Sequence, residues 1–400
     1  MKWVSIIDDN RLRIQIENKI EEIYVAIKNF KPDNSFGLMD GYGAVFLFLY
    51  YYYKYTKQEA VLSLLNERFS VFYTSFWKMG YGAFCGGYAG ICWLIRFLNK
   101  EGVIEISDID DALCDLDEAI LHFMLQDIRN GNFDFLHGSL GMAYYYATFT
   151  NKNNSADRMQ IFLEALNNTK DTDSNGSIKW LKETYANYEN IGMVYNLSLA
   201  HGMASIVAFL TKLFKNANNE LALELLTPTI LFFKNSANPE NYISTFPKWF
   251  EQNRITPSES PLFWCYGDPG IAQALYNSGV LIKDTVMTDL ALTALIKTTN
   301  RLVGVQEACF CHGSSSLCHI YNRLFQKTKF NVFKGAALFW LNDTIERGKN
   351  STKYAGYQLL ENHEGSGNMS LLAGLSGIGL SLLATVDTIE PKWDECVLLS

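Results

Sequence analysis

Proline and cysteine are both scarce in this chain, with 8 of each among 400 residues. Because proline interrupts helices, its scarcity favours long helices over a loop-rich all-β fold. Eight cysteines are too dilute for a disulfide scaffold, and the N-terminal segment is charged too early for a signal peptide. We therefore expect reduced thiols in the cytoplasm, where clustered cysteines serve as metal ligands or nucleophiles.

Long apolar runs and excess positive charge are also absent. The longest apolar block, 44–53, is well short of the roughly 18 residues that a membrane-spanning helix requires. The net charge is −8, and no basic stripe of the kind that binds nucleic acid is visible. Hydrophobic residues nevertheless make up 48% of the chain, which excludes a disordered polymer. We expect a large folded core, no integral membrane segment and no nucleic-acid partner.

A short glycine-rich motif recurs seven times. Each copy consists of a small residue, two further residues and a second small residue, followed by an apolar helical stretch. The closing residues lie at 43, 90, 141, 205, 270, 316 and 377, and each interval can hold one helix, a return helix and two loops. Helical spacing of apolar residues predicts return helices over 57–76 and 109–128. The repeat therefore predicts about fourteen helices in seven pairs, arranged as an α-solenoid or a closed ring.

Glycine at these positions allows close approach of neighbouring backbones at the helix starts. Two longer intervals contain polar, turn-rich segments near 169–195 and 236–263, which we interpret as loops or small extensions. No low-complexity linker divides the chain. We therefore predict one domain over 1–400, with the repeat core at about 35–385.

Chemically active residue types gather just before four of the motifs. If all copies point the same end of a helix towards one axis, these residues converge. Three of them, Cys265, Cys311 and His312, make a Cys₂His set, and three protein ligands with an open fourth position are typical of catalytic zinc. Cys309 is a rival ligand. A free cysteine is most often a small buried hydrophobe. Cys85, Cys92, Cys114 and Cys396 have no equivalent partners, and we expect them to pack in the core or lie on the surface, whereas Cys318 flanks the sixth motif together with Cys309.

These residues resemble a known family. WCYG at 264–267, CHG at 311–313, AHG at 200–202 and Asp-x-x-x-Gly at 134–138, inside this repeat, are similar to the LanC-like lanthionine cyclases from about Ser35 to Thr385. The resemblance implies an all-α fold, an α/α toroid of about seven inner and seven outer helices. It also implies one Zn²⁺ per chain, held by Cys265, Cys311 and His312.

The resemblance implies catalytic positions for His201, Asp134 and Tyr266. It is incomplete at Pro261, where some cyclases carry arginine, and at His137, where acidic residues can occur. The metal positions are intact, so these departures concern how the substrate is positioned.

The activity implied is zinc-dependent addition of peptide cysteine thiols to dehydroalanine or dehydrobutyrine, which forms the thioether rings of lanthipeptides. His201 would protonate the enolate at its α-carbon and Asp134 would orient His201, with His137 as the runner-up for either role. Alternatives are a LanC-like protein that acts on or binds a small thiol such as glutathione, and a non-catalytic zinc toroid. Toroidal prenyltransferases and α/α-barrel glycosidases are further alternatives, although a glycosidase would want paired carboxylates.

The chain has no phosphate-binding loop of the Walker type, so ATP-driven dehydration would happen elsewhere. The expected partners are a dehydrated precursor peptide, a separate lanthipeptide dehydratase and a transporter. The length predicts a stand-alone cyclase. The expected location is cytoplasmic, either free or peripheral to the membrane within a biosynthetic complex.

Overall fold

The computed structural model describes residues 2–149, 155–186, 189–252, 256–359 and 368–400. They form two compact units. The first comprises residues 1–120 and 305–393, and the second comprises residues 121–304 and 394–400. The prediction of a single domain with a repeat core at 35–385 stays a prediction.

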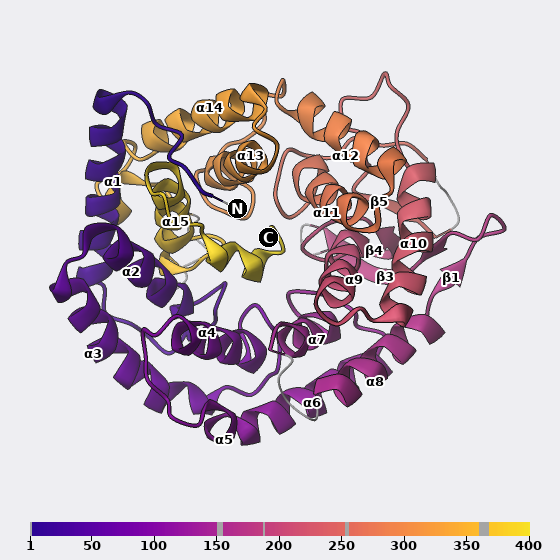
Figure 1. Ribbon diagram of the computed structural model, residues 1–400, viewed down its shortest axis with the longest axis horizontal. Coiled ribbons are helices and arrows are strands. Elements are labelled where there is room, and N and C mark those ends of the chain that lie inside the picture. The colour runs from indigo at the N-terminus through magenta and orange to yellow at the C-terminus, as the bar shows by residue number, and fades with distance from the viewer. Residues whose placement is uncertain (1, 150–154, 187–188, 253–255, 360–367) are drawn as a thin grey trace. The chain divides into compact units, whose positions relative to one another are not determined.

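The regular elements in the described residues of the first unit are all helices, joined by loops. α15 packs against α2, α13 and α1, and the strongest helix pair is α13 with α14, as can be followed in Figure 1. Its elements are α1 (Asn10–Asn29), α2 (Gly43–Thr56), α3 (Glu59–Ser75), η1 (Phe76–Lys78), α4 (Tyr88–Lys100), α5 (Ile109–Ala112), the start of α6 (Cys114–Arg129), α13 (Ser314–Thr328), α14 (Asn331–Arg347), η2 (Tyr354–Gly356), α15 (Leu375–Val386) and the start of η4 (Lys392–Val397).

The second unit combines helices with short strands. α9 packs against α7, α10 and α11, and α11 packs against α12. Its elements are the rest of α6, α7 (Ser139–Thr148), α8 (Ser155–Asn168), β1 (Asp171–Thr172), β2 (Ile178–Lys179), β3 (Lys182–Ala186), β4 (Glu189–Asn196), α9 (Met203–Ala217), α10 (Glu220–Asn235), β5 (Trp249–Glu251), α11 (Asp268–Ile282) and α12 (Thr285–Thr298).

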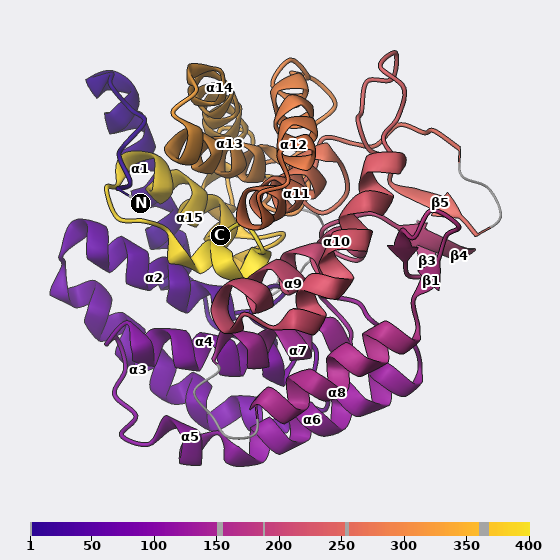
Figure 2. The ribbon, with the colours of Figure 1, turned by 45° about the vertical axis from the view of Figure 1, so that its right-hand side comes forward.

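The strands lie in the two polar insertions, where the sequence analysis expected loops or small extensions. β1 and β2 form an antiparallel pair, and β3, β4 and β5 form an antiparallel sheet in that order, visible in Figure 2. Lys182 of β3 lies opposite Val194 of β4, which in turn lies opposite Glu251 of β5. In the described residues, the first insertion therefore forms four short strands, and the second contributes β5 to the same sheet and is otherwise irregular.

All seven glycine-rich motifs begin a helix, as predicted. The motif helices are α2, α4, α7, α9, α11, α13 and α15. The return helix expected over 57–76 is α3, whereas the one expected over 109–128 is divided into α5 and α6 around the buried Leu113. Asp108 caps the first of these pieces by accepting bonds from the N–H groups of Asp110 and Asp111.

The close approach that the glycines were expected to allow is present. A Cβ atom on Gly270 would lie 2.1 Å from the carbonyl oxygen of Trp264, and one on Gly377 would lie 1.9 Å from that of Leu371. No side chain fits at such distances. Where a copy closes with serine, as at Ser205, the serine hydroxyl donates to the carbonyl oxygen of the motif glycine, here Gly202, at 2.6 Å. Packing at the helix start therefore explains the small residues.

The apolar block at 44–53 forms most of α2, and the side chains of residues 44–52 are buried there. A helix buried on every face needs no polar side, which accounts for the uninterrupted apolar run. Within the described part of the chain, no helix combines the length and the apolar character that crossing a bilayer requires.

Candidate active site

Asp134 lies on the loop before α7 in the second unit, with its side chain buried. Its Oδ1 accepts a 2.9 Å bond from the backbone N–H of His137, and its Oδ2 lies 2.9 Å from Nδ1 of His201. Oδ2 also accepts a bond from Nζ of Lys182. Burial raises the pKa of Asp134, but the positive charges of His201 and Lys182 outweigh burial and hold that pKa well below its usual value. Asp134 is therefore an ionised carboxylate at neutral pH.

His201 lies two residues before the start of α9. The intervening Gly202 leaves room for the turn, because a Cβ atom there would lie 2.3 Å from the carbonyl oxygen of Asn196. The backbone N–H of His201 donates to Oγ of Ser198 at 3.1 Å, which fixes the loop. Since Asp134 is an acceptor, its contact assigns the proton of the neutral ring to Nδ1 and leaves Nε2 as the nitrogen that can exchange a proton with a substrate. The side chain is 26% exposed, so a substrate can reach it.

Two further aromatic rings lie against His201. The His137 ring stacks on it with centroids 5.8 Å apart, and the Tyr266 ring lies at 5.8 Å with a tilt of 34°. The Tyr266 hydroxyl accepts a bond from Nδ2 of Asn196 at 3.3 Å. Burial raises the pKa of Tyr266, so its phenol stays protonated and can donate a hydrogen bond. Four residues singled out from the sequence thus meet within one unit: Asp134, His137, His201 and Tyr266.

Cys265 precedes Tyr266 on the loop before α11 and is buried. Its carbonyl oxygen accepts bonds from the N–H groups of Leu199 and Ala200 at 3.1 and 3.2 Å. These two bonds hold the loop of Cys265 beside the loop of His201. Gly267 closes the turn into the helix with φ of 130°, a conformation that glycine adopts readily and other residues rarely do.

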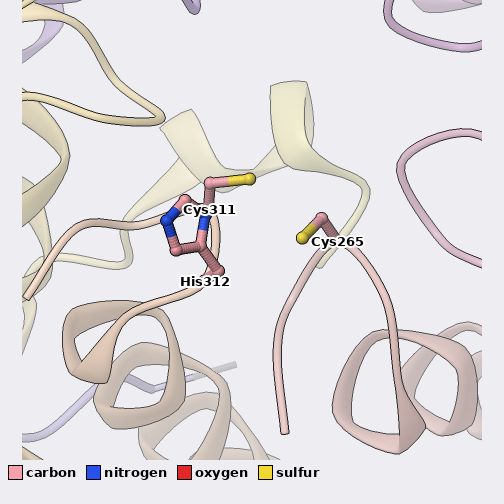
Figure 3. Close-up of side chains that lie close together, drawn as sticks. All are labelled: Cys265, Cys311 and His312. Carbon is pink, nitrogen blue, oxygen red and sulfur yellow. The ribbon is translucent and has the colours of Figure 1, made fainter. Parts of the chain in front are cut away.

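Cys311 and His312 belong to the first unit, on the loop before α13. Figure 3 shows these side chains on their loop, and Cys265 on the loop before α11. The N–H group of Cys311 donates to the carbonyl oxygen of Leu372 at 2.8 Å. Nε2 of His312 lies 3.2 Å from Oε2 of Glu307. A carboxylate that accepts from one imidazole nitrogen orients the ring and leaves the other nitrogen for a metal.

Cys309 lies in the same loop and remains a rival ligand. Its Sγ is 3.5 Å from Oε2 of Glu307, and the possible ligand atoms of Glu307, Cys309 and His312 all lie within 4.8 Å of one another. These three residues form a second potential metal-binding set within the first unit, which we call the Glu307 set.

The other cysteines lie in the core or on the surface, as expected. None of them is in a disulfide; Cys85, Cys92, Cys318 and Cys396 are buried, and Cys114 is exposed. Burial raises the pKa of Cys318 to about 12, which leaves its thiol protonated and unreactive at neutral pH.

Three residues that contact the candidate site were not found from the sequence. Lys182 contacts Asp134, Asn196 contacts Tyr266, and Glu307 contacts His312. Lys182 lies in an insertion expected to form loops or small extensions, and Asn196 and Glu307 each lie six residues before a motif glycine, outside the stretch that the sequence analysis considered. A search for acceptors and cations just upstream of each motif would have found Asn196 and Glu307.

Comparison with known proteins supports the resemblance seen in the sequence. The family model for lanthionine synthetase C-like proteins matches residues 32–398. The chain is 24% identical over 306 residues to the nisin biosynthesis protein NisC of Lactococcus lactis subsp. lactis, covering 70% of this chain and 68% of that protein. The solved structure of nisin cyclase superposes with a TM-score of 0.74 at 18% identity and covers 98% of both chains. The chain therefore belongs to the lanthionine synthetase C-like family and has the all-α, α/α-toroid fold that the resemblance implied.

Proposed function

We propose that this protein is a lanthionine cyclase, which adds cysteine thiols of a dehydrated precursor peptide to dehydroalanine or dehydrobutyrine. The observation that carries the proposal is the 2.9 Å contact between Asp134 and His201, at the positions that the family motifs assign to the catalytic pair. Similarity to NisC, a nisin biosynthesis protein, supports the same activity and a peptide substrate.

The pair suits proton transfer in a Michael-type addition. The new C–S bond forms at the β-carbon, the π electrons move to the enolate, and the α-carbon then takes a proton. His201 gives that proton from Nε2, because Asp134 holds the Nδ1 side and stabilises the imidazolium. The proton that the thiol loses can return to His201, so the cycle balances without an external acid.

Tyr266 and His137 shape the surroundings of His201. The protonated phenol of Tyr266 is a donor beside the imidazole and can stabilise negative charge on the enolate oxygen. The ring of His137 limits how far the His201 ring can rotate, since the two rings are stacked. In this proposal Tyr266 is catalytic and His137 is a neighbour that keeps His201 in place.

We propose Cys265, Cys311 and His312 as the ligands of one Zn²⁺ per chain. Two cysteine thiols outside any disulfide and an imidazole are a donor set that zinc favours. The contact of His312 with Glu307 supports a metal role, because a carboxylate commonly orients the imidazole of a metal ligand in this way. When bound, zinc lowers the pKa of a substrate thiol and so favours its thiolate.

Two alternatives make different demands on the same residues. A protein that binds a small thiol such as glutathione needs the metal ligands and no acid for an α-carbon. A non-catalytic zinc toroid needs neither acid nor peptide. The buried, ionised Asp134 aligned on His201 favours the cyclase, since a charged pair of this kind is costly to bury and serves proton transfer well.

The proposal is tested with a dehydrated peptide that carries one cysteine. Cyclisation leaves the peptide mass unchanged and makes its thiol resistant to alkylation, so iodoacetamide labelling followed by mass spectrometry reports the rate. The His201→Gln variant is the matched negative control. Dehydrated peptides that all keep a free thiol, together with glutathione that is bound or consumed, would establish the small-thiol alternative instead.

The proposed partners follow from the substrate. A dehydratase must act first to supply the dehydroamino acids, and a transporter would take the finished peptide. We propose a cytoplasmic protein, free or at the membrane periphery within such a complex.

A further inference from the structure

The insertion at 169–195 contributes a cation to the catalytic pair. Lys182, the first residue of β3, reaches Oδ2 of Asp134 with its Nζ and donates to the carbonyl oxygen of His201 at 3.0 Å. The same carboxylate oxygen is 2.9 Å from Nδ1 of His201. One oxygen atom therefore serves both the imidazole and the ammonium group.

The position of Lys182 is fixed by its strand and by its neighbours. Lys182 lies opposite Val194 in the β3–β4 ladder. Two residues earlier, the buried Trp180 donates from its indole N–H to the carbonyl oxygen of Leu166 at 2.8 Å. The Lys182 side chain is only 24% exposed, so its contact with Asp134 is partly shielded from solvent. These constraints differ from those on a solvent-exposed lysine, whose ion pairs contribute little.

We propose that Lys182 is a positioning residue of the catalytic pair, so that the β3–β4–β5 insertion is part of the active site. This inference rests on the proposed function. Lys182 compensates the charge of Asp134 and ties the His201 loop to the strand. Because its Nζ contacts the same Asp134 oxygen that lies against Nδ1 of His201, and also the His201 carbonyl oxygen, Lys182 fixes how the carboxylate faces the ring.

The other charged or titratable groups around the pair come from separate elements. His137 lies on the loop of Asp134, Tyr266 lies on the loop before α11, and Asp127 of α6 interacts electrostatically with Asp134. Lys182 is the lysine that contacts the Asp134 carboxylate. Removing its charge is therefore expected to change the contacts of the Asp134 carboxylate directly.

The test uses three variants of the full chain in the peptide cyclisation assay. Lys182→Met removes the charge and keeps most of the length, and we expect kcat to fall about 10- to 100-fold with KM little changed, as for other residues that orient a catalytic group. Lys182→Arg restores a cation and should recover most of the rate. Lys179→Met is the control, because Lys179 is a buried lysine of the same insertion that pairs with Asp173 instead.

A second measurement needs no substrate and separates this inference from the proposed function. In protein labelled with ¹⁵N-histidine, the His201 signal is assigned from its loss in His201→Gln. At one pH near neutrality, the ¹⁵N signals of the His201 ring should move in Lys182→Met relative to the wild type, because the carboxylate that contacts Nδ1 has lost its cation, and they should stay unchanged in Lys179→Met. If the His201 signals of the three proteins coincide, or if Lys179→Met lowers kcat as much as Lys182→Met, the inference is wrong whatever the substrate is. If the signals differ but no peptide is cyclised, the proposed function fails and the role of Lys182 stands.

Discussion

Replacing Asp134 with asparagine removes the negative charge on which the candidate active site depends. The carboxylate accepts from the N–H of His137, from Nδ1 of His201 and from Nζ of Lys182. An amide keeps one acceptor oxygen but turns an NH₂ group towards one of these donors. The ring of His201 is then no longer held in the Nδ1–H form, and Lys182 is left without its carboxylate.

The magnitude follows from the hydrogen bonds and the ion pair that the substitution removes. A hydrogen bond to a charged group contributes about 1.5–3 kcal/mol. Breaking a fully buried ion pair costs about 3–5 kcal/mol, but the side chains of Lys182 and His201 are 24% and 26% exposed, which reduces the cost. We expect the free energy of unfolding of the variant to be about 2–3 kcal/mol lower than that of the wild type. Loss of an oriented general acid should lower the cyclisation rate on the order of 10²–10⁴-fold.

The assay compares cyclisation rate, zinc content and urea unfolding in the wild type and in Asp134→Asn. The matched control is Asp173→Asn, because the Asp173 carboxylate, in the same unit, pairs with Lys179 instead. We expect unchanged zinc content in both variants and a large rate loss only in Asp134→Asn. A cyclisation rate within about threefold of the wild type, at equal zinc content, would refute the assignment of Asp134 as the group that orients the general acid.

The pH dependence of the same variant has a definite sign. The folded state lowers the pKa of Asp134, so its contribution to stability is fully present above the unfolded value of about 3.9 and is lost as the pH falls through the lower, folded value. The difference in unfolding free energy between the wild type and Asp134→Asn should therefore be constant near neutrality and shrink below about pH 4. A difference that grows on acidification would contradict the ion-pair account.

The remaining predictions concern the metal and the fold. Cys311→Ala should lose the single zinc and cyclisation together, whereas Cys309→Ala should keep both; the reverse pattern in metal analysis would assign the ion to the Glu307 set. His201→Ala should keep zinc and either stop cyclising or release rings with scrambled α-carbon stereochemistry, as chiral analysis of the hydrolysed product would show. Gly270→Ala should lower the unfolding free energy by several kcal/mol, because its Cβ would lie 2.1 Å from a carbonyl oxygen; unchanged thermal stability would show that the loop yields easily.

The sequence by itself determined the repeat and the residues at its helix starts. A helix start packed against its own preceding loop accepts only a small residue, so each motif leaves a local and readable mark. The helices that follow are long and apolar enough to be recognised from spacing alone. The same motifs identified the family and singled out Asp134, His201, Tyr266 and the proposed metal ligands, because each lies within a few residues of a motif glycine.

Only the tertiary structure decided what surrounds the pair of Asp134 and His201. The strands of the insertions are between two and eight residues long, and the shorter ones cannot show an alternating pattern. Asp134 and His201 are 67 residues apart, and Lys182 is 48 residues from Asp134, so no periodicity links them. A lysine in a polar segment looks like any solvated residue in the sequence. It becomes part of the site only because a strand and a buried tryptophan bring its ammonium group to a carboxylate that needs a compensating charge.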